Sequence, residues 1–130
     1  MKILIVDDDA DLLQALRRRL RAQPGWEITF AVGGAEALIV IDEITFDVVL
    51  TDLNMPGIDG TRVIAAGRRR SAVTICVVMT SAAVDHDELG ADAVFEKPAD
   101  ITEMTRWIDD AYHHRASTAP DRASSLIIRA

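Results

Sequence analysis

The sequence of 130 residues has a single cysteine, Cys76, and no hydrophobic run long enough to cross a bilayer. One cysteine cannot form an internal disulfide, which is typical of proteins from reducing compartments. A membrane-spanning helix needs about 20 apolar residues. The N-terminal run, residues 3–6, is followed by three aspartates and is too short for a signal peptide. We therefore expect a cytoplasmic protein with no membrane association, in which Cys76 is a small core residue.

Positive charge is also scarce. The chain has 14 Lys and Arg against 21 Asp and Glu, which gives a net charge of −7. Nucleic acids and anionic membranes would repel such a surface, so we expect no direct nucleic-acid binding. We interpret the one basic run, which contains Arg17, Arg18, Arg19 and Arg21, as a solvated helix face. The three histidines are likewise interpreted as solvated: His86, His113 and His114.

Apolar runs alternate with helical patterns along most of the chain. The length fits one domain, and an apolar fraction of 49% is enough for a buried core. Apolar residues at three- and four-residue spacing predict helices between the runs. Such alternation predicts a parallel sheet with helices on both faces, in an α/β fold. The predicted strands are residues 2–6, 26–32, 47–51, 73–79 and 93–96.

Polar side chains stand just past four of these strands. In open parallel sheets, function lies beyond the carboxyl ends of the strands. Asp9 fits the N-cap of the first helix, so we leave it out of the site. Thr80 is favoured over its neighbour because four apolar residues precede it directly. The candidate residues, in chain order, are Asp7, Asp8, Asp52, Thr80 (or Ser81) and Lys97.

This combination of residues predicts phosphoryl chemistry at a magnesium site. Clustered carboxylates repel one another, and a hard divalent cation removes that repulsion. Magnesium takes oxygen ligands and usually keeps several waters, which leaves positions for phosphate oxygens. The Lys97 ammonium suits a phosphoryl oxygen. A carboxylate can itself be the nucleophile and form an aspartyl phosphate.

The motifs resemble the receiver domains of two-component response regulators. The resemblance covers residues 2–112 and includes ILIVDDD at 3–9, DLNMPGIDG at 52–60, the Thr80-Ser81 pair and GADAVFEKP at 90–98. It implies a doubly wound, five-stranded parallel sheet of strand order 2-1-3-4-5, the flavodoxin-like order. It also implies a receiver domain over residues 1–114, followed by a flexible tail or linker at 115–130.

The resemblance also implies a role for each matching residue. Asp52 corresponds to the phosphoacceptor and Lys97 to its ion-pair partner. The hydroxyl of Thr80, or alternatively of Ser81, follows the phosphoryl group. A cis Lys97-Pro98 peptide bond is usual for the family. The implied ligands of Mg²⁺, for which Mn²⁺ is a possible substitute, are Asp7, Asp8, Asp52 and the backbone carbonyl of Asn54.

The family resemblance implies partners as well. A histidine kinase or a histidine phosphotransfer protein supplies the phosphoryl group and docks near the first helix. A downstream protein or a fused output domain receives the signal. Such a domain catalyses only its own phosphorylation and dephosphorylation, so we do not expect an enzyme in the usual sense.

Two features depart from the family pattern. The stretch between Thr80 and Lys97 is about five or six residues shorter than is typical, so residues 82–88 are predicted to form a loop or a single turn in place of the fourth helix. Val94 occupies the position where an aromatic switch residue is expected. Phe95 is displaced by one residue, which puts it on the opposite face of the strand.

Two alternative functions remain open at this point. A pseudo-receiver would be a binding module that is not regulated by phosphorylation, and the two departures favour it. A phosphatase of the haloacid-dehalogenase type also uses an aspartyl phosphate, but it needs an acid two positions after the nucleophile. That position is Asn54, which cannot donate a proton. The sequence does not decide between a stand-alone domain and a fragment of a longer regulator. It leaves open where residues 126–128 would dock.

Overall fold

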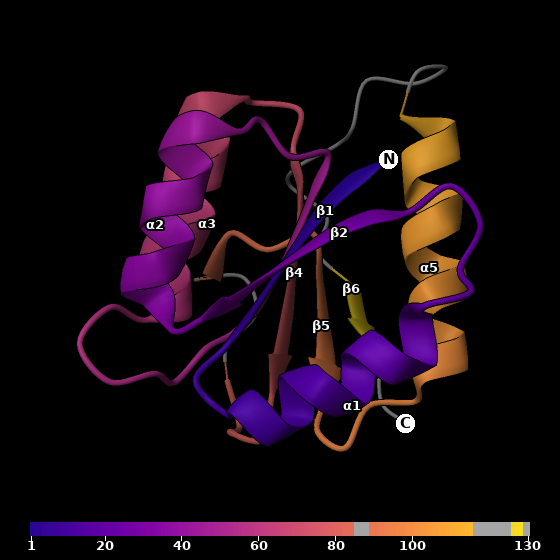
Figure 1. Cartoon of the computed structure of the whole chain (residues 1–130), viewed down its shortest axis with the longest axis horizontal. Coiled ribbons are helices and arrows are strands. Elements are labelled where there is room, and N and C mark those ends of the chain that lie inside the picture. The colour runs from indigo at the N-terminus through magenta and orange to yellow at the C-terminus, as the bar shows by residue number, and fades with distance from the viewer. Residues whose placement is uncertain (85–88, 116–125, 129–130) are drawn as a thin grey trace.

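The computed structural model describes residues 1–84, 89–115 and 126–128, and it contains the predicted parallel sheet (Figure 1). The strands run in the order β2-β1-β3-β4-β5-β6, and all pairs are parallel. The first five strands thus confirm the predicted order 2-1-3-4-5. They are β1 (Lys2–Asp7), β2 (Glu27–Val32), β3 (Val48–Asp52), β4 (Ile75–Thr80) and β5 (Ala93–Glu96).

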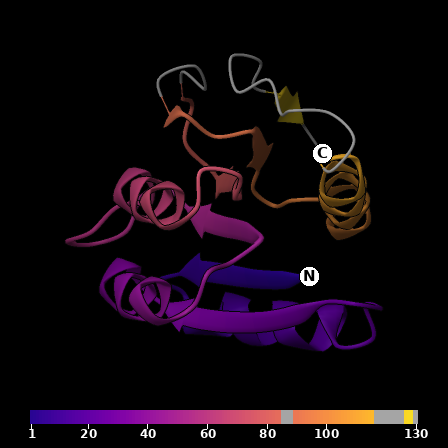
Figure 2. The same ribbon diagram turned by 90° about the horizontal axis from the view of Figure 1, so that it is seen from above.

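Four described helices cover the two faces of the sheet, which makes the fold doubly wound. Figures 1 and 2 show α2 and α3 on one side of the sheet and α1 and α5 on the other. Connections between neighbouring parallel strands require such crossovers. The helices are α1 (Ala10–Leu20), α2 (Gly34–Glu43), α3 (Gly60–Arg70) and α5 (Ile101–His114).

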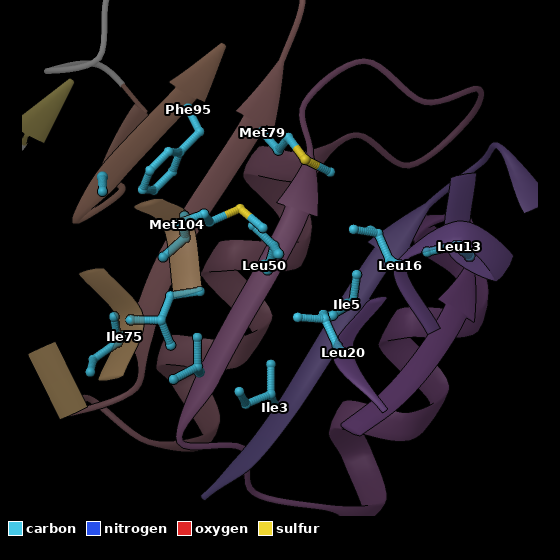
Figure 3. Close-up of a cluster of buried hydrophobic side chains, with 14 residues drawn as sticks. Ile3, Ile5, Leu13, Leu16, Leu20, Leu50, Ile75, Met79, Phe95 and Met104 are labelled. Atoms are coloured by element: carbon cyan, nitrogen blue, oxygen red, sulfur yellow. The ribbon is translucent and has the colours of Figure 1, made fainter. Parts of the chain in front are cut away.

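Strand β1 shows how the sequence builds both cores at once. Successive side chains of a strand point to opposite faces, and residues 3–6 are all fully buried. Ile3 and Ile5 pack with Leu16 of α1 and Met104 of α5 (Figure 3). Leu4 and Val6 belong to the other cluster, with side chains from α2 and α3. The continuous apolar run is therefore the consequence of helices on both faces.

The predicted fourth strand begins two residues later than expected. Val73 is 55% exposed, and β4 starts at Ile75. A turn precedes the strand, because the Thr74 amide donates to the Ser71 carbonyl at 3.2 Å. Val73 therefore lies outside the sheet despite its apolar side chain and its high strand propensity. The buried Cys76 is a core residue, as predicted.

The connection between β4 and β5 is described only in part. Residues 82–84 contain no regular element, and residues 85–88 lie outside the described part of the chain, so the predicted loop or single turn over residues 82–88 stays a prediction. Asp92 anchors the end of this connection: its carboxylate accepts from the Cys76 amide at 2.8 Å and from Arg68 Nη2 at 3.0 Å. Arg68 of α3 thus holds the start of β5. The sequence pattern offers no full fourth helix at this place.

The short apolar run near the end of the chain, for which the sequence indicates no docking place, forms a sixth strand, β6 (Leu126–Ile128). It pairs with β5 and lies at the edge of the sheet (Figure 2). Residues 116–125 and 129–130 lie outside the described residues, so the prediction of a flexible tail there stays a prediction, as does the domain boundary at residue 114. Among the described helices, none combines the length and apolarity needed to span a membrane.

Candidate functional site

Three carboxylates meet at the carboxyl end of the sheet. Asp7 is the last residue of β1, and Asp52 is the last residue of β3. These strands are neighbours, with Val6 paired to Thr51, so their ends lie side by side. One carboxylate oxygen from each of Asp7, Asp8 and Asp52 lies within 4.8 Å of the other two. The predicted convergence of acids from two separate loops is therefore present.

Lys97 completes this cluster from the carboxyl end of β5. It follows β5 directly. Its Nζ donates to Asp7 Oδ2 at 2.7 Å and lies 3.2 Å from Asp52 Oδ2. Its backbone amide donates to the Thr80 carbonyl at 2.9 Å, which fixes the lysine to the end of β4. The Lys97-Pro98 peptide bond is cis, as the family resemblance implies.

The cluster is partly buried, and burial shifts the pKa values of its groups. Asp7 is fully buried, Asp52 is 8% exposed, and Asp8 is exposed. Burial raises the pKa of Asp52; the Lys97 ammonium opposes that shift and the Asp7 carboxylate adds to it. Burial would lower the pKa of Lys97, but the hydrogen bond to Asp7 and the charges of Asp7 and Asp52 raise it. A single cation thus serves two carboxylates.

The donor atoms fit a hard divalent cation. All three side chains offer carboxylate oxygen, which is the ligand type that magnesium prefers, and the exposed Asp8 lies next to the two buried acids. Three carboxylates with one lysine leave negative charge that a cation would balance. Asn54 is exposed and follows β3 by two residues. The ligand role of its carbonyl stays a prediction.

The loop after Asp52 is held by a close backbone approach that sequence analysis did not identify. The Gly60 amide donates to the Leu53 carbonyl at 2.8 Å. Asp59 caps α3 by accepting from the Arg62 amide at 3.2 Å. A Cβ on Gly60 would lie only 2.3 Å from the Asp52 carbonyl oxygen and 3.0 Å from Leu53 Cα. The glycine of the motif therefore has a steric cause, and the aspartate before it caps the helix.

Replacing Gly60 by alanine should displace the backbone that carries Asp52. The added methyl group meets backbone and not a flexible side chain, so we expect the free energy of unfolding to fall by about 2 kcal/mol. A shift of Asp52 should also slow any reaction at its carboxylate by about 10-fold to 100-fold. Denaturant unfolding and the rate of phosphoryl uptake measure the two effects.

Gly67→Ala is the matched control in the same helix. Its added methyl group has Val49 Cγ2 as nearest neighbour, at 3.3 Å, which is a side-chain atom. A Gly60→Ala protein that matches Gly67→Ala in stability and reactivity would contradict the steric argument.

The two candidate hydroxyls lie in different environments. Thr80 ends β4 and is buried, and its Oγ1 accepts from the Ala82 amide at 3.1 Å. Ser81 follows the strand and is exposed. Val94 and Phe95 face opposite sides of β5, as predicted: Val94 packs in the cluster with Val78, and Phe95 packs in the other core.

Most of the remaining sequence predictions near the site are also met. The Asp9 carboxylate caps α1 by accepting from the Asp11 and Leu12 amides. His113 and His114 are exposed, whereas His86 lies outside the described residues. The basic side chains of α1 are exposed, and Arg17 lies over the ring of Phe30, 4.6 Å from its centroid.

An apolar groove that the sequence analysis missed opens beside Lys97. Its volume is about 480 Å³. The half-buried Leu12 of α1 contributes to it, and the signal in the sequence was a leucine on the edge of the helix stripe. The groove runs between α1 and the loop after β5, where its lining includes Leu12, Ala15, Leu16, Pro98 and Ile101.

Comparisons with known proteins agree with this geometry. Residues 3–109 match the family described as the response regulator receiver domain. The transcriptional regulatory protein PrrA of Mycobacterium tuberculosis is 36% identical over 132 residues, which cover 98% of this chain and 56% of PrrA. The DNA-binding transcriptional regulator NtrC of Escherichia coli is 33% identical over 117 residues, which cover 86% of this chain and 25% of NtrC.

Solved receiver domains share the fold. A CheY-like receiver domain protein of Methanospirillum hungatei superposes with a TM-score of 0.80 and 25% identity, covering 89% of this chain and 96% of that one. The response regulator TrrA of Thermotoga maritima, solved in complex with Mg²⁺ and BeF, has a TM-score of 0.74 and 27% identity, covering 85% and 97% of the two chains. The chain spans about half the length of PrrA. It belongs to the response regulator receiver domain family of two-component systems.

Proposed function

We propose that the protein is a phosphoacceptor switch that receives a phosphoryl group on Asp52 from a histidine kinase or a histidine phosphotransfer protein. The observation that supports this most is the placement of Lys97 Nζ, 3.2 Å from Asp52 Oδ2, in the same cluster as the carboxylates of Asp7 and Asp8. Asp52 thereby has a cation beside the oxygen that would carry the phosphoryl group.

The transfer needs positioning and charge neutralisation more than covalent help from the protein. An Asp52 oxygen attacks the phosphorus, the bond between phosphorus and the donor imidazole nitrogen breaks, and the electron pair returns to the imidazole. Lys97 offsets the charge on the transferring oxygens. Asp7, Asp8, Asp52 and the Asn54 carbonyl would hold Mg²⁺, or Mn²⁺ in its place, which when bound neutralises further phosphoryl charge.

The product adds a charge of about −1.5 to −2 at neutral pH. We assign Thr80 as the hydroxyl that turns toward the new oxygens, because it is buried at the strand end, whereas Ser81 is exposed. Its present bond with the Ala82 amide would then break. The residues that follow Thr80 change their arrangement, and this change alters the binding of a downstream partner or of a fused output domain.

The groove beside Lys97 is the proposed docking place of the phosphodonor. It places an apolar surface from α1 and from the loop after β5 beside Lys97, whose Nζ lies 3.2 Å from the acceptor carboxylate. Burial of half-exposed apolar side chains there would contribute affinity. Exposed arginines of α1, including Arg19 at the groove, would favour an acidic rim on the donor.

Magnesium removal tests the proposed function directly. Incubated with acetyl phosphate and Mg²⁺, the protein should gain a single phosphoryl group, visible by intact-mass measurement. An EDTA-treated sample should gain none, because the carboxylate cluster then has only Lys97 to offset the incoming charge. Failure to form an adduct with Mg²⁺ would contradict the proposal.

That failure would instead favour the second candidate function, a pseudo-receiver that binds partners without phosphorylation. Val94 at the expected aromatic position, and the short connection after Thr80, are the observations that favour it. On the favoured proposal the domain reacts only with its own Asp52, so it acts as a switch and not as an enzyme on other substrates.

A further inference from the structure

Strand β6 occupies an edge of the sheet that would otherwise be open. It has three residues, fewer than any other described strand. Leu126, Ile127 and Ile128 pair in parallel with Ala93, Val94 and Phe95 of β5. Edge strands present unpaired backbone groups that accept another strand. In this chain, a segment far beyond α5 fills that position.

Strand β5, which pairs with β6, also leads into the proposed phosphorylation site. Lys97 follows β5 directly, and its amide bonds to the Thr80 carbonyl at the end of β4. Thr80 is paired with Glu96, the last residue of β5. The two groups proposed to contact the phosphoryl oxygens therefore lie at the ends of β4 and β5, the two strands directly inside β6.

A packed cluster links the loop after Thr80 to the partner of Ile127. Val94 is buried with Val78 and Ile64, and the half-buried Val84 and Leu89 pack against the same cluster. Both latter residues come from the short connection between β4 and β5. A rearrangement that starts at Thr80 would move Val84, and Val94 would transmit it to the outer edge of β5.

We propose that the edge of β5 is a strand-docking surface which Leu126–Ile128 occupies while Asp52 is unmodified, and that phosphorylation of Asp52 weakens this docking. The inference rests on the proposed function. In the arrangement described here, β6 is paired, Lys97 bonds to Asp7, and the Thr80 hydroxyl accepts from Ala82. When Thr80 turns to the phosphoryl group, the shortest strand is the member of the ladder that gives way first.

Hydrogen exchange of the full chain tests the docking and its response. In the unmodified protein, those amides of residues 126–128 that point toward β5 should exchange slowly enough to show pairing. After phosphorylation with acetyl phosphate and Mg²⁺, their exchange should become faster by about tenfold or more. Asp52→Asn, treated in the same way, should show no change.

A second measurement uses the reciprocity of linked equilibria. If a phosphoryl group weakens β6, loss of β6 must favour the phosphorylated arrangement by up to the same factor. The affinity for beryllofluoride with Mg²⁺, a non-covalent phosphoryl analogue, should therefore rise about threefold to tenfold in Ile127→Pro. Ile127→Gly, which keeps the backbone N–H, should show a smaller rise. Ala119→Pro, placed before the existing Pro120 and outside β6, is the control and should match the unaltered chain.

The outcomes separate this inference from the proposed function. Absence of any protected amide within residues 126–128 of the unmodified protein would overturn the docking. A phosphoryl adduct that leaves their exchange unchanged would overturn the coupling alone. A missing adduct on Asp52 would overturn the proposed function, and the coupling with it.

Discussion

Replacing Asp52 by asparagine should give a folded protein that gains no phosphoryl group from acetyl phosphate and Mg²⁺. Asparagine keeps the size of the side chain but has no carboxylate oxygen to form an acyl phosphate. We expect phosphorylation to fall by about 10³-fold or more, to the limit of detection by intact mass. No other carboxylate in the cluster has the placement of Asp52 at the end of β3 beside Lys97.

The variant should remain folded because Lys97 keeps its shorter bond, at 2.7 Å, to Asp7. The substitution also removes the repulsion between the neighbouring carboxylates of Asp7 and Asp52. Asp42→Asn, an exposed aspartate of α2, makes the same chemical change away from the site and should phosphorylate normally. A phosphoryl adduct on the Asp52→Asn protein would mean that another residue is the acceptor.

The parallel sheet was predictable because it depends on local patterns, whereas its strand order followed from the family resemblance. Continuous apolar runs predict strands that are covered on both faces, as residues 3–6 of β1 show. The convergence of the acids follows from the same patterns, because parallel strands bring their carboxyl ends to one edge. Asp7, Asp52 and Lys97 were therefore identifiable from the sequence.

Other features depend on contacts between segments far apart in the chain. The apolar run at 126–128 is too short to show where it pairs, and its partner β5 lies about 30 residues earlier. The need for glycine at position 60 depends on how closely the Asp52 carbonyl oxygen approaches, because it would lie 2.3 Å from an added Cβ. Val73 has a strand-like side chain, but the turn at Ser71 places it outside β4. Periodicity carries no information on any of these.

The contact of Lys97 with Asp7 has a consequence that the family motif does not indicate. The motif pairs the lysine with the phosphoacceptor, yet Nζ lies closer to Asp7 Oδ2, at 2.7 Å, than to Asp52 Oδ2, at 3.2 Å. The Asp7 side chain is only 1% exposed. Its other oxygen accepts from the Asp9 amide at 2.9 Å. Lys97 is thus the cation that makes a buried carboxylate tolerable in the metal-free protein.

Lys97→Ala should therefore affect stability as well as phosphoryl transfer. Removing one partner of a buried ion pair leaves an uncompensated charge; because Lys97 is 22% exposed, we expect a loss of about 3 kcal/mol, at the lower end of the range for such pairs. Transfer to Asp52 should slow by about 10²-fold to 10³-fold, as for loss of one charge-stabilising donor. Denaturant unfolding in EDTA and the rate of adduct formation with Mg²⁺ measure the two losses.

Magnesium separates the two roles of the lysine. A cation held by Asp7, Asp8 and Asp52 offsets the same buried charge, and a ligand that binds only the folded state stabilises it. Millimolar Mg²⁺ should thus restore part of the stability of Lys97→Ala while transfer stays slow, because the ammonium beside the transferring oxygens is still missing. Lys2→Ala, the only other lysine in the chain and an exposed one, is the control. Equal stability of the two variants in EDTA would show that Asp7 does not depend on Lys97, and full recovery of transfer with Mg²⁺ would remove the lysine from the reaction.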